Sequence, residues 1–546
     1  MNEKADNSFF HQDCTGLRVL VLTPHPDDEI NVAGNMIYVL RQMGAEVFVL
    51  YSTNGDFDGK QEVRFKEVEK SLSLLGVNAD HYDLLGYGDT YNGTGKPHVY
   101  HAETAMTSPA GHRETYGAAG LEEYHFQRHG QHGEYTRKNF LSDLREYIVD
   151  KRAEIIFCVD YDLHADHRAL SLGFESVIGE LLQQEDNDYF PVVYKRFAYA
   201  TAFTAYSDFS ELNLQEIKRP VPGEIESYAY DVIDKSAYLW ERRVRFPVHQ
   251  DLRESLFSKN IFAQAIFAHK TQHNEKNAYN LINSDEIYWQ RRTDNLAFKA
   301  EISASSGETG SLRRFQLLTP ADVEEKIPSW KDVAWKPECD DLEKAVCYTW
   351  RVPQKISKIC LYGPLNAAAS ETKVKISFDD GDSMIVGPLK EFGTPLLIEV
   401  AKEHVGEMRL QLMEIDDKCG LSYCEIFAES EQLNPLLPYI KILVDGNFAY
   451  RYGCDKQRCD IGLSCYRYGY VGQNISYRVL EGNASIENND RLIWKDNEPV
   501  VVRAFLEGDE KIFDQVELYR IDAGSRMRNF LRNLMNRIYL VKEKRN

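Results

Sequence analysis

The sequence predicts a multidomain protein: an α/β domain with a Rossmann-like parallel sheet, two β-sandwich domains and a C-terminal amphipathic helix. Strand and helix patterns alternate in the first half of the chain, short alternating apolar runs dominate the second half, and the C-terminal residues follow a helical apolar period. The 546 residues also exceed what one hydrophobic core organises. We place the domains at 1–297, 298–433, 434–522 and 523–546.

The first domain begins with two strand patterns, each followed by a helix pattern. A buried strand is expected over Leu17–Leu22, which is apolar and rich in branched side chains, and an amphipathic helix over Asn31–Met43. A second strand is expected over Glu46–Ser52 and a second helix over Gln61–Leu75. Because this order is typical of parallel sheets covered by helices, functional groups are expected at the carboxyl ends of the strands.

A third strand and three further helices are expected before residue 300. The apolar run EIIFCVD at 154–160 predicts a buried strand. Apolar periodicity predicts helices over Lys138–Lys151, Leu170–Gln183 and Phe257–Lys270, whereas residues 95–137 are rich in His, Gly and Tyr and predict a loop. The motif YDLHADHRAL therefore follows a strand, as TPHPDDE does earlier.

From about Glu301 the pattern changes to short alternating runs separated by turns. Strands at such regular spacing are typical of β-sandwiches, and the spacing after Pro438 resembles an immunoglobulin-like module without the antibody markers. The runs are ISKICLYG, TKVKISFDDGD, MRLQLME, YCEIFAES, YIKILVDGN, ISYRVL, VVVRAFLEG and VELYRI.

Composition and charge narrow the class of protein. The formal net charge of −21 argues against generic nucleic-acid binding, which needs a basic surface. The N-terminus lacks the basic start and apolar core of a secretory signal, so we expect a cytoplasmic protein whose ten cysteines are mostly reduced. Cys454, Cys459 and Cys465 lie close enough in sequence to permit a metal or redox site, although no fourth ligand is evident.

The C-terminal helix is expected to be basic as well as amphipathic. Residues 525–546 hold five Arg and two Lys against one Glu, within an acidic protein. Such a helix suits an anionic membrane surface, here the inner face of the cell membrane; the alternative is a terminal helix docked on its own acidic domain. The expected apolar stripe comprises Met527, Phe530, Leu531, Leu534, Met535, Ile538 and Val541.

Two polar clusters at strand ends could together bind a metal ion. A catalytic zinc usually has three protein ligands and one position for water. His25 and Asp28 are close enough in one loop to bind the same ion, and the motif HADH offers His164 and His167. One of these histidines would bind the metal while the other faces the substrate.

The remaining groups of the two clusters suggest a hydrolase. A bound divalent ion lowers the pKa of its water and polarises a carbonyl oxygen. Asp27 lies beside Asp28 and could take the proton of the water, and a histidine could stabilise the oxyanion or protonate the leaving group. This set favours hydrolysis of an amide or ester over redox chemistry, because no flavin or nicotinamide fingerprint accompanies it.

The motifs PHPDDE, RFKE, HADH and AHKTQ, within residues 17–297, resemble those of the PIG-L/LmbE-like de-N-acetylases. These zinc-dependent enzymes remove acetyl from N-acetylglucosamine units. The resemblance implies a Zn²⁺ cofactor, in a site that would also accept Fe²⁺ or Co²⁺. It implies metal ligation by His25, Asp28 and His167, a general base at Asp27, an oxyanion stabiliser or acid at His164, and orientation of a histidine by Asp166.

The resemblance also implies two substrate-binding residues. Arg64 and Asp89 match positions that hold sugar hydroxyls in relatives, and two opposed hydrogen-bonding groups suit that task. For Arg64, the alternative is a salt bridge with Glu67 at the start of a helix.

The chain departs from the family pattern at two positions. Asp56 stands where relatives often have Glu, and Thr271 stands where they often have Ser. His269, in the same AHKTQ motif, is expected to support the pocket structurally, and Glu29 to support the site geometry or the start of the following helix.

Residues 298–430 resemble discoidin-like or galactose-binding-like sandwiches, from AEISASSGE to CEIFAES, which implies either glycan binding or a scaffold. We therefore expect a zinc-dependent deacetylase acting on an N-acetylated amino sugar, in a glycan or lipid-linked precursor at the cytosolic membrane face. One alternative substrate is a small soluble N-acetylglucosamine conjugate or sugar nucleotide. Another alternative is a non-catalytic glycan-binding protein, whose signature would be a broken ligand set.

Overall fold

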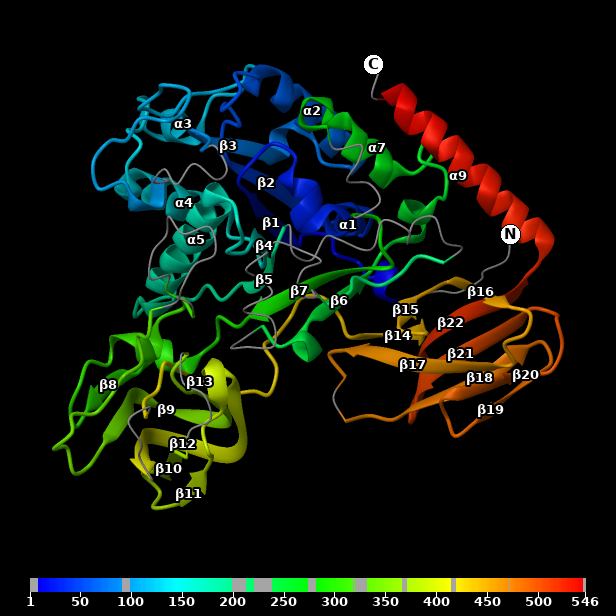
Figure 1. Cartoon of the computed structure of the whole chain (residues 1–546). Helices are drawn as coiled ribbons and strands as arrows, with labels where there is room; N and C mark the ends of the chain where they lie inside the picture. The colour runs from blue at the N-terminus through cyan, green and yellow to red at the C-terminus, as the bar shows by residue number, and fades with distance from the viewer. Residues whose placement is uncertain are drawn as a thin grey trace.

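The computed structural model shows an α/β domain, several mainly antiparallel sheets and a long C-terminal helix (Figure 1). The succession expected from the sequence, an α/β region followed by β-rich regions, is confirmed. The structure describes residues 8–90, 99–198, 213–219, 238–273, 281–317, 319, 331–365, 371–413, 419–470 and 472–543.

Within these residues, the first domain is built on a seven-stranded sheet in the order β3-β2-β1-β4-β5-β7-β6. Strands β1 to β5 run parallel, and β7 is antiparallel to both of its neighbours. The chain order reverses between β1 and β4, and ligands of such sheets bind in the crevice beyond the strand ends at this point. The strands are β1 (Arg18–Thr23), β2 (Glu46–Thr53), β3 (Tyr82–Tyr87), β4 (Ile155–Val159), β5 (Val192–Arg196), β6 (Val244–Pro247) and β7 (Asp285–Arg291).

Helices cover both faces of this sheet. Helices α1, α2 and α7 pack together, and α4 packs against α5 (Figure 1). Each cluster buries the branched side chains of the central strands, which explains why β1, β2 and β4 are almost continuously apolar. The helices are α1 (Asp28–Gln42), α2 (Gln61–Leu74), α3 (Tyr124–His129), α4 (Arg137–Lys151), α5 (Ala165–Gln183) and α7 (Ile261–Ala268).

Several helix boundaries differ from those expected, those of α5 and α7 most, and a helix lies in an expected loop. Helix α5 begins at Ala165, because the His164 side chain accepts a hydrogen bond from the main chain and caps the helix. Helix α7 begins at Ile261, because Asn260 caps it in the same way. The segment 95–137, expected to be a loop, contains α3, and its residues 95–98 lie outside the described part of the chain.

The second region forms a six-stranded sheet among the described residues, in the order β11-β10-β12-β9-β13 with β8 beside β9. The two long strands β9 and β12 shift register between Glu399 and Glu407, where bulges bend a sheet. The strands are β8 (Glu301–Ala304), β9 (Ala345–Tyr362), β10 (Lys373–Phe378), β11 (Ser383–Val386), β12 (Pro395–Met413) and β13 (Tyr423–Phe427).

The third region has two sheets that enclose their own apolar core, which includes Ile442 and Val502. Within the described residues the sheets have the orders β15-β14-β17-β20-β19 and β16-β22-β21-β18. The strands are β14 (Tyr439–Val444), β15 (Asn447–Phe448), β16 (Arg451–Asp455), β17 (Asp460–Tyr468), β18 (Ile475–Glu481), β19 (Ala484–Glu487), β20 (Arg491–Trp494), β21 (Val500–Leu506) and β22 (Asp509–Ile521).

The third region is joined to the first domain by buried polar contacts. The hydroxyls of Tyr194 on β5 and Tyr468 on β17 lie 2.7 Å apart. The Asn434 side-chain amide donates to both hydroxyls, at 2.8 and 2.6 Å. The Tyr439 hydroxyl donates to the Arg245 carbonyl at 2.6 Å. Since these groups are satisfied by one another, the interface resembles a domain interior.

Helix α9 (Ala523–Glu543) leaves the third region and returns along the first domain beside α7 (Figure 1). The Asn536 side-chain oxygen Oδ1 accepts from the Phe257 main-chain N–H at 3.0 Å, and the Asn536 side-chain Nδ2 donates to the Ser255 carbonyl at 2.9 Å. The Tyr539 ring packs 5.7 Å from that of Phe267. Among the described helices, none has the length and apolarity required to cross a bilayer.

Candidate metal and catalytic site

The two predicted clusters meet at the point where the strand order of the first sheet reverses. His25 and Asp28 follow β1, whereas His164 and His167 follow β4. Strands β1 and β4 are hydrogen-bonded neighbours, with Leu22 beside Cys158. Parallel pairing therefore brings together two loops that are far apart in the chain.

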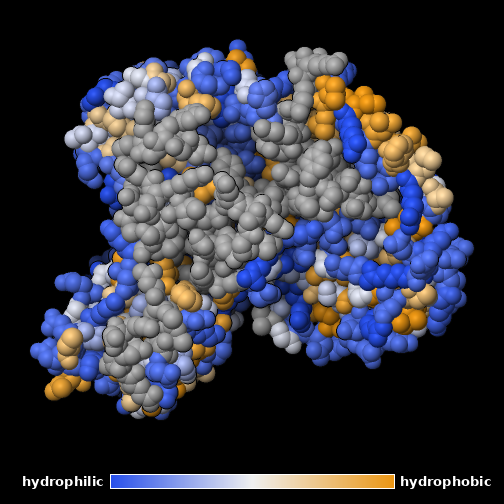
Figure 2. All heavy atoms as spheres, viewed as in Figure 1, coloured by the Kyte–Doolittle hydropathy of each residue, from blue (hydrophilic) through white to orange (hydrophobic). Residues whose placement is uncertain are grey.

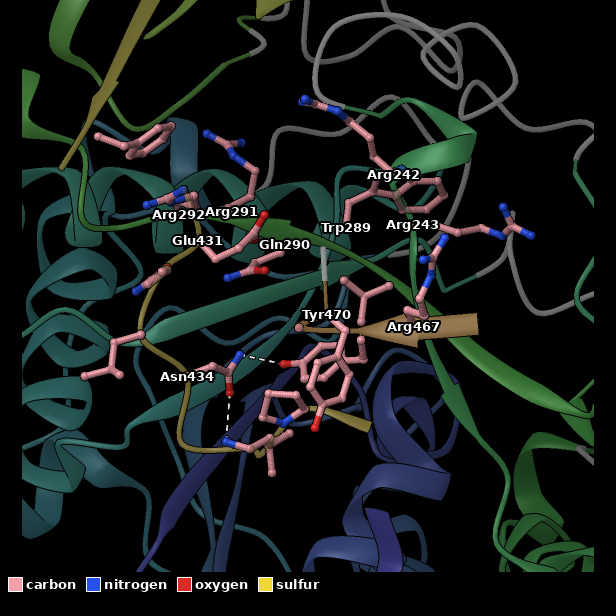
Figure 3. A pocket seen from close by; sticks show the side chains of 18 of the residues that line it. Arg242, Arg243, Trp289, Gln290, Arg291, Arg292, Glu431, Asn434, Arg467 and Tyr470 are labelled. Carbon is pink, nitrogen blue, oxygen red and sulfur yellow. Dashed lines mark hydrogen bonds between the residues drawn. The ribbon is translucent and has the colours of Figure 1, made fainter. Parts of the chain in front are cut away.

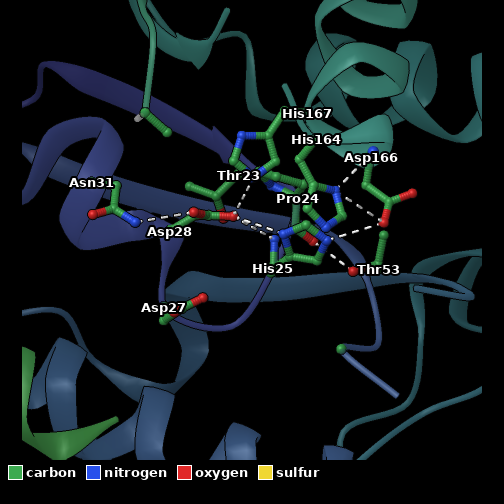
Figure 4. A network of polar contacts seen from close by, with 12 residues as sticks. Thr23, Pro24, His25, Asp27, Asp28, Asn31, Thr53, His164, Asp166 and His167 are labelled. Carbon is green, nitrogen blue, oxygen red and sulfur yellow. Dashed lines mark hydrogen bonds and ion pairs between the residues drawn. The ribbon is translucent and has the colours of Figure 1, made fainter. Parts of the chain in front are cut away.

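The Asp28 carboxylate lies between two histidines (Figure 4). Its Oδ2 atom is 2.9 Å from His25 Nδ1 and 3.1 Å from His167 Nε2. Ligand atoms about 2.0–2.2 Å from a tetrahedral zinc ion lie roughly 3.3 Å from one another. The two distances from Asp28, and the nitrogen and carboxylate chemistry of the three residues, fit a divalent metal ion.

Two overlapping groups among the described residues have donor atoms within 4.8 Å of one another. One group comprises His25, His164 and His167, and the other comprises His25, Asp89, His164 and Asp166. The ring centroids of His25 and His164 lie 4.4 Å apart. His164 thus lies beside the proposed ligands.

Further carboxylates orient the histidines. His25 Nε2 lies 3.1 Å from Asp166 Oδ2, and Asp166 also accepts the Thr90 main-chain N–H at 2.8 Å. His167 Nδ1 lies 2.9 Å from Asp162 Oδ2, and both side chains are fully buried. Such outer contacts fix the ring orientation of metal-binding histidines. Asp166 was expected to orient a histidine of its own motif. In the structure its carboxylate lies 3.7 Å from His164 Nδ1 of that motif and closer, at 3.1 Å, to His25 Nε2 of the other.

The carboxylates make the site favourable for positive charge. Burial by itself disfavours the charged imidazole of His25, but Asp89, Asp166 and Asp28 outweigh it and raise the pKa of His25 well above its usual value. Burial likewise opposes charge on His167, yet Asp162 and Asp28 raise its pKa to about 10. For His164, burial and the two neighbouring histidines lower the pKa well below its usual value.

Asp27 occupies a different position from the other members of its motif. Figure 4 shows its side chain set apart from the histidines. Its φ of 135° costs about 1–3 kcal/mol, and its main-chain N–H donates to Glu29 Oε2 at 3.1 Å. Its carboxylate lies 3.5 Å from Arg64 Nη2 and retains 17% exposure. A strained but accessible carboxylate is suited to chemistry rather than to packing.

Glu29 connects Asp27 to the end of α7. Glu29 Oε1 lies 2.6 Å from His269 Nε2 and accepts the Ser71 hydroxyl at 3.0 Å. Burial opposes the charge on Glu29, but His269 outweighs it and lowers the pKa of Glu29. His269, just after α7, therefore supports the site structurally through Glu29, as expected.

Arg64 is buried and reaches two main-chain carbonyls. It donates to Gly55 at 3.0 Å and to Pro26 at 3.1 Å, and its Nη1 lies 3.5 Å from Asp89 Oδ2. The alternative salt bridge with Glu67 is not formed among the described contacts. Glu67 accepts instead the hydroxyl and main-chain N–H of Thr271.

Sequence reasoning did not identify the partners of Asp56. Asp56 accepts the Asp89 main-chain N–H at 2.8 Å and the Tyr116 hydroxyl at 2.5 Å. Tyr116 belongs to the polar segment before α4, and no sequence pattern links it to the site. Sequence reasoning also did not identify Asp162 as the partner of His167, although both residues lie in the motif YDLHADH.

Two features lie outside this site. A further group with metal-ligand spacing, apart from the two around His25, comprises His125, His129 and Asp143. Asp143 accepts the Tyr87 hydroxyl at 2.6 Å and lies 2.7 Å from His125 Nδ1, so these hydrogen bonds account for its burial. A cavity of about 690 Å³ is lined by parts of all three regions, including Arg242, Asn434 and others shown in Figure 3.

The cysteines are thiols rather than disulfides in the structure. Cys454, Cys459 and Cys465 form no disulfide, and the groups with metal-ligand spacing among the described residues do not include them. Burial raises the pKa of Cys454 to about 11, which makes a thiolate ligand less favourable there.

Two family models match the chain. The model of PIG-L, described as GlcNAc-PI de-N-acetylase, matches residues 20–178. A domain of unknown function, DUF7402, matches residues 295–427. A search of the curated proteins found no match.

Comparison with solved structures found similar chains, among them deacetylases and a family 32 CBM. N,N'-diacetylchitobiose deacetylase from Pyrococcus horikoshii has 20% identity over 34% of this chain and 61% of its own, less than two thirds of its length, with a TM-score of 0.23. Teicoplanin deacetylase Orf2 in its zinc-inhibited form has 14% identity over 50% of this chain and 97% of its own, with a TM-score of 0.26. The family 32 CBM from C. perfringens NanJ has 12% identity over 24% of this chain and 94% of its own, with a TM-score of 0.19.

The family match begins within β1 and ends within α5, so it contains both histidine clusters and the strands that position them. The resemblance of the PHPDDE and HADH motifs is therefore confirmed at the level of the domain. Residues 20–178 of this chain form a domain of the PIG-L family.

Proposed function

We propose that the protein is a metal-dependent hydrolase that removes N-acetyl groups from N-acetylglucosamine-type sugars. The observation that carries this proposal is the position of Asp28 Oδ2, close to both His25 and His167. The carboxylate of the preceding residue, Asp27, remains accessible. The description of the matching family, GlcNAc-PI de-N-acetylase, supports the sugar class.

In the proposed site, His25, Asp28 and His167 hold the ion, which we propose is Zn²⁺, with Fe²⁺ or Co²⁺ also fitting such ligands. When bound, the ion would polarise the acetyl carbonyl and lower the pKa of a water. Asp162 and Asp166 keep the rings of His167 and His25 oriented through the hydrogen bonds described above.

The proton transfers fall to Asp27 and His164. Asp27 accepts the proton of the attacking water, because its carboxylate is the accessible one beside the ligand loop. His164, next to the ligand rings, donates a hydrogen bond to the developing oxyanion or a proton to the departing amine. Water attack breaks the amide C–N bond and yields acetate and the free amino sugar.

The substrate would be bound by Arg64 and Asp89, which face each other across 3.5 Å at the edge of the site. We propose a glycan or lipid-linked precursor at the cytosolic membrane face as the substrate, because α9 exposes large apolar side chains beside the catalytic domain. The second region, 298–433, would bind glycan or act as a scaffold.

The decisive experiment is mass spectrometry of N-acetylated precursors after incubation with the purified protein. We expect loss of one acetyl group per modified sugar with the native protein and none with Asp27→Asn. A small soluble N-acetylglucosamine conjugate, tested in parallel, distinguishes the alternative substrate. No deacetylation of either class by zinc-loaded protein would favour the non-catalytic glycan-binding alternative.

A further inference from the structure

Helix α9 presents its apolar side chains to solvent. These side chains recur at helical spacing, and each is about half exposed, from 46% for Leu534 to 63% for Phe530. Figure 2 shows hydrophobic groups along the outer edge of the molecule where α9 lies, with hydrophilic groups between them. The outer stripe comprises Met527, Phe530, Leu531, Leu534, Met535, Ile538 and Val541.

The helix is held to the body by a different face. Asn536 is buried and bonds the main chain before α7, and the Tyr539 hydroxyl exchanges hydrogen bonds with the Gln264 side chain at 3.0 and 3.2 Å. Lys270 and Glu543 form an ion pair at 3.9 Å. Docking therefore combines these polar contacts with packing of the Tyr539 ring on Phe267, and it leaves the outer stripe exposed, the reverse of the usual orientation of a surface helix.

The charge of the helix indicates which kind of surface covers the outer stripe. The segment 525–546 carries five Arg and two Lys against one Glu, and Arg528, Arg537 and Lys542 are exposed beside the stripe. Two copies of the helix packed stripe to stripe would bring like charges together. An anionic surface that also accepts apolar groups would satisfy both features, and a bilayer with acidic lipids has both.

We propose that the outer stripe of α9 inserts into the interface of an anionic lipid bilayer, with the flanking Arg and Lys side chains on the lipid phosphates. A helix of this length extends about 30 Å in the plane of the interface. Since α9 is held to α7, and His269 after α7 contacts Glu29, which accepts the main-chain N–H of Asp27, binding keeps the catalytic domain at the bilayer surface, behind α9.

The test is cosedimentation of the full-length protein with vesicles of phosphatidylglycerol and phosphatidylethanolamine, and separately of phosphatidylcholine. We expect binding to the acidic vesicles, weakening as salt is raised, and little binding to phosphatidylcholine. The variant Phe530→Asp/Ile538→Asp should bind about tenfold or more weakly, because each change removes an inserted apolar side chain. Val352→Asp, at a 69% exposed position on β9, is the matched control and should bind as the native protein does.

Thermal unfolding of each variant and deacetylation of a small substrate are measured alongside, so loss of folding or of the proposed chemistry is distinguished from loss of lipid binding. The proposal is overturned if the native protein ignores acidic vesicles, or if the double variant binds them undiminished. It is also overturned if light scattering shows a dimer that the double variant dissociates while no vesicle is bound.

Discussion

His269 Nε2 lies 2.6 Å from Glu29 Oε1, and both side chains are completely buried. The two residues are 240 positions apart in the chain. The other oxygen of Glu29 accepts the main-chain N–H of Asp27, whose φ of 135° requires support. The pair therefore connects the end of α7 to the proposed general base.

Replacing His269 by Ala should lower both stability and turnover. It leaves Glu29 as an uncompensated buried charge, which costs about 3–5 kcal/mol of unfolding free energy, and it loosens Asp27. We expect kcat to fall while KM and metal content change little. Chemical denaturation and steady-state kinetics measure the two effects. The double variant Glu29→Gln/His269→Gln should recover part of the stability, and no recovery would contradict a paired charge.

Replacing Asp162 by Asn should weaken metal binding. Asp162 accepts from His167 Nδ1 at 2.9 Å, and loss of such a contact typically costs about 10–100-fold in metal affinity. Titration of the apoprotein with Zn²⁺ against a chelator measures the change. Asp143→Asn, which alters the buried carboxylate beside His125, is the control and should leave this affinity intact. Equal affinities for native protein and Asp162→Asn would contradict the assignment of His167 as a ligand.

Replacing Asp27 by Asn should abolish most of the activity while metal is retained. A general base contributes typically about 10²–10⁴-fold, and the Asn amide cannot accept the proton of water. We expect kcat/KM to fall by that order, with metal occupancy by elemental analysis unchanged. Asp27→Glu keeps a carboxylate and should show intermediate activity. If Asp27→Asn retained full activity, another residue would have to be the base.

Replacing Asn434 by Ala should destabilise the junction between the first and third regions. The change leaves the Tyr194 and Tyr468 hydroxyls without a shared donor, at a cost of about 1–3 kcal/mol for buried polar groups. Thermal unfolding should shift to lower temperature as a single transition. The control is Asn497→Ala, at an exposed position between β20 and β21 of the third region. Two separate transitions already in the native protein would contradict a common interface.

The sequence by itself determined the main strands and helices of the first domain, and the residues that surround the site. A strand such as β1 can be recognised because its apolar run is local, and the PHPDDE and HADH motifs lie within a few residues of strand ends. Parallel topology then predicts that these motifs meet, and the structure brings His25, Asp28 and His167 together as expected.

Only the tertiary structure decided which side chains contact one another. Asp166 contacts His25 of the other motif at 3.1 Å as well as His164 of its own at 3.7 Å. Glu29 meets His269. The contacts of Asp166 with His25 and of Glu29 with His269 depend on strand register and on helices packed across the sheet. The period of α9 predicted an apolar stripe but not that Asn536 would dock on the other side. The spacing of residues along a helix specifies which side chains share a face. Which surface packs against that face depends on contacts between segments distant in sequence.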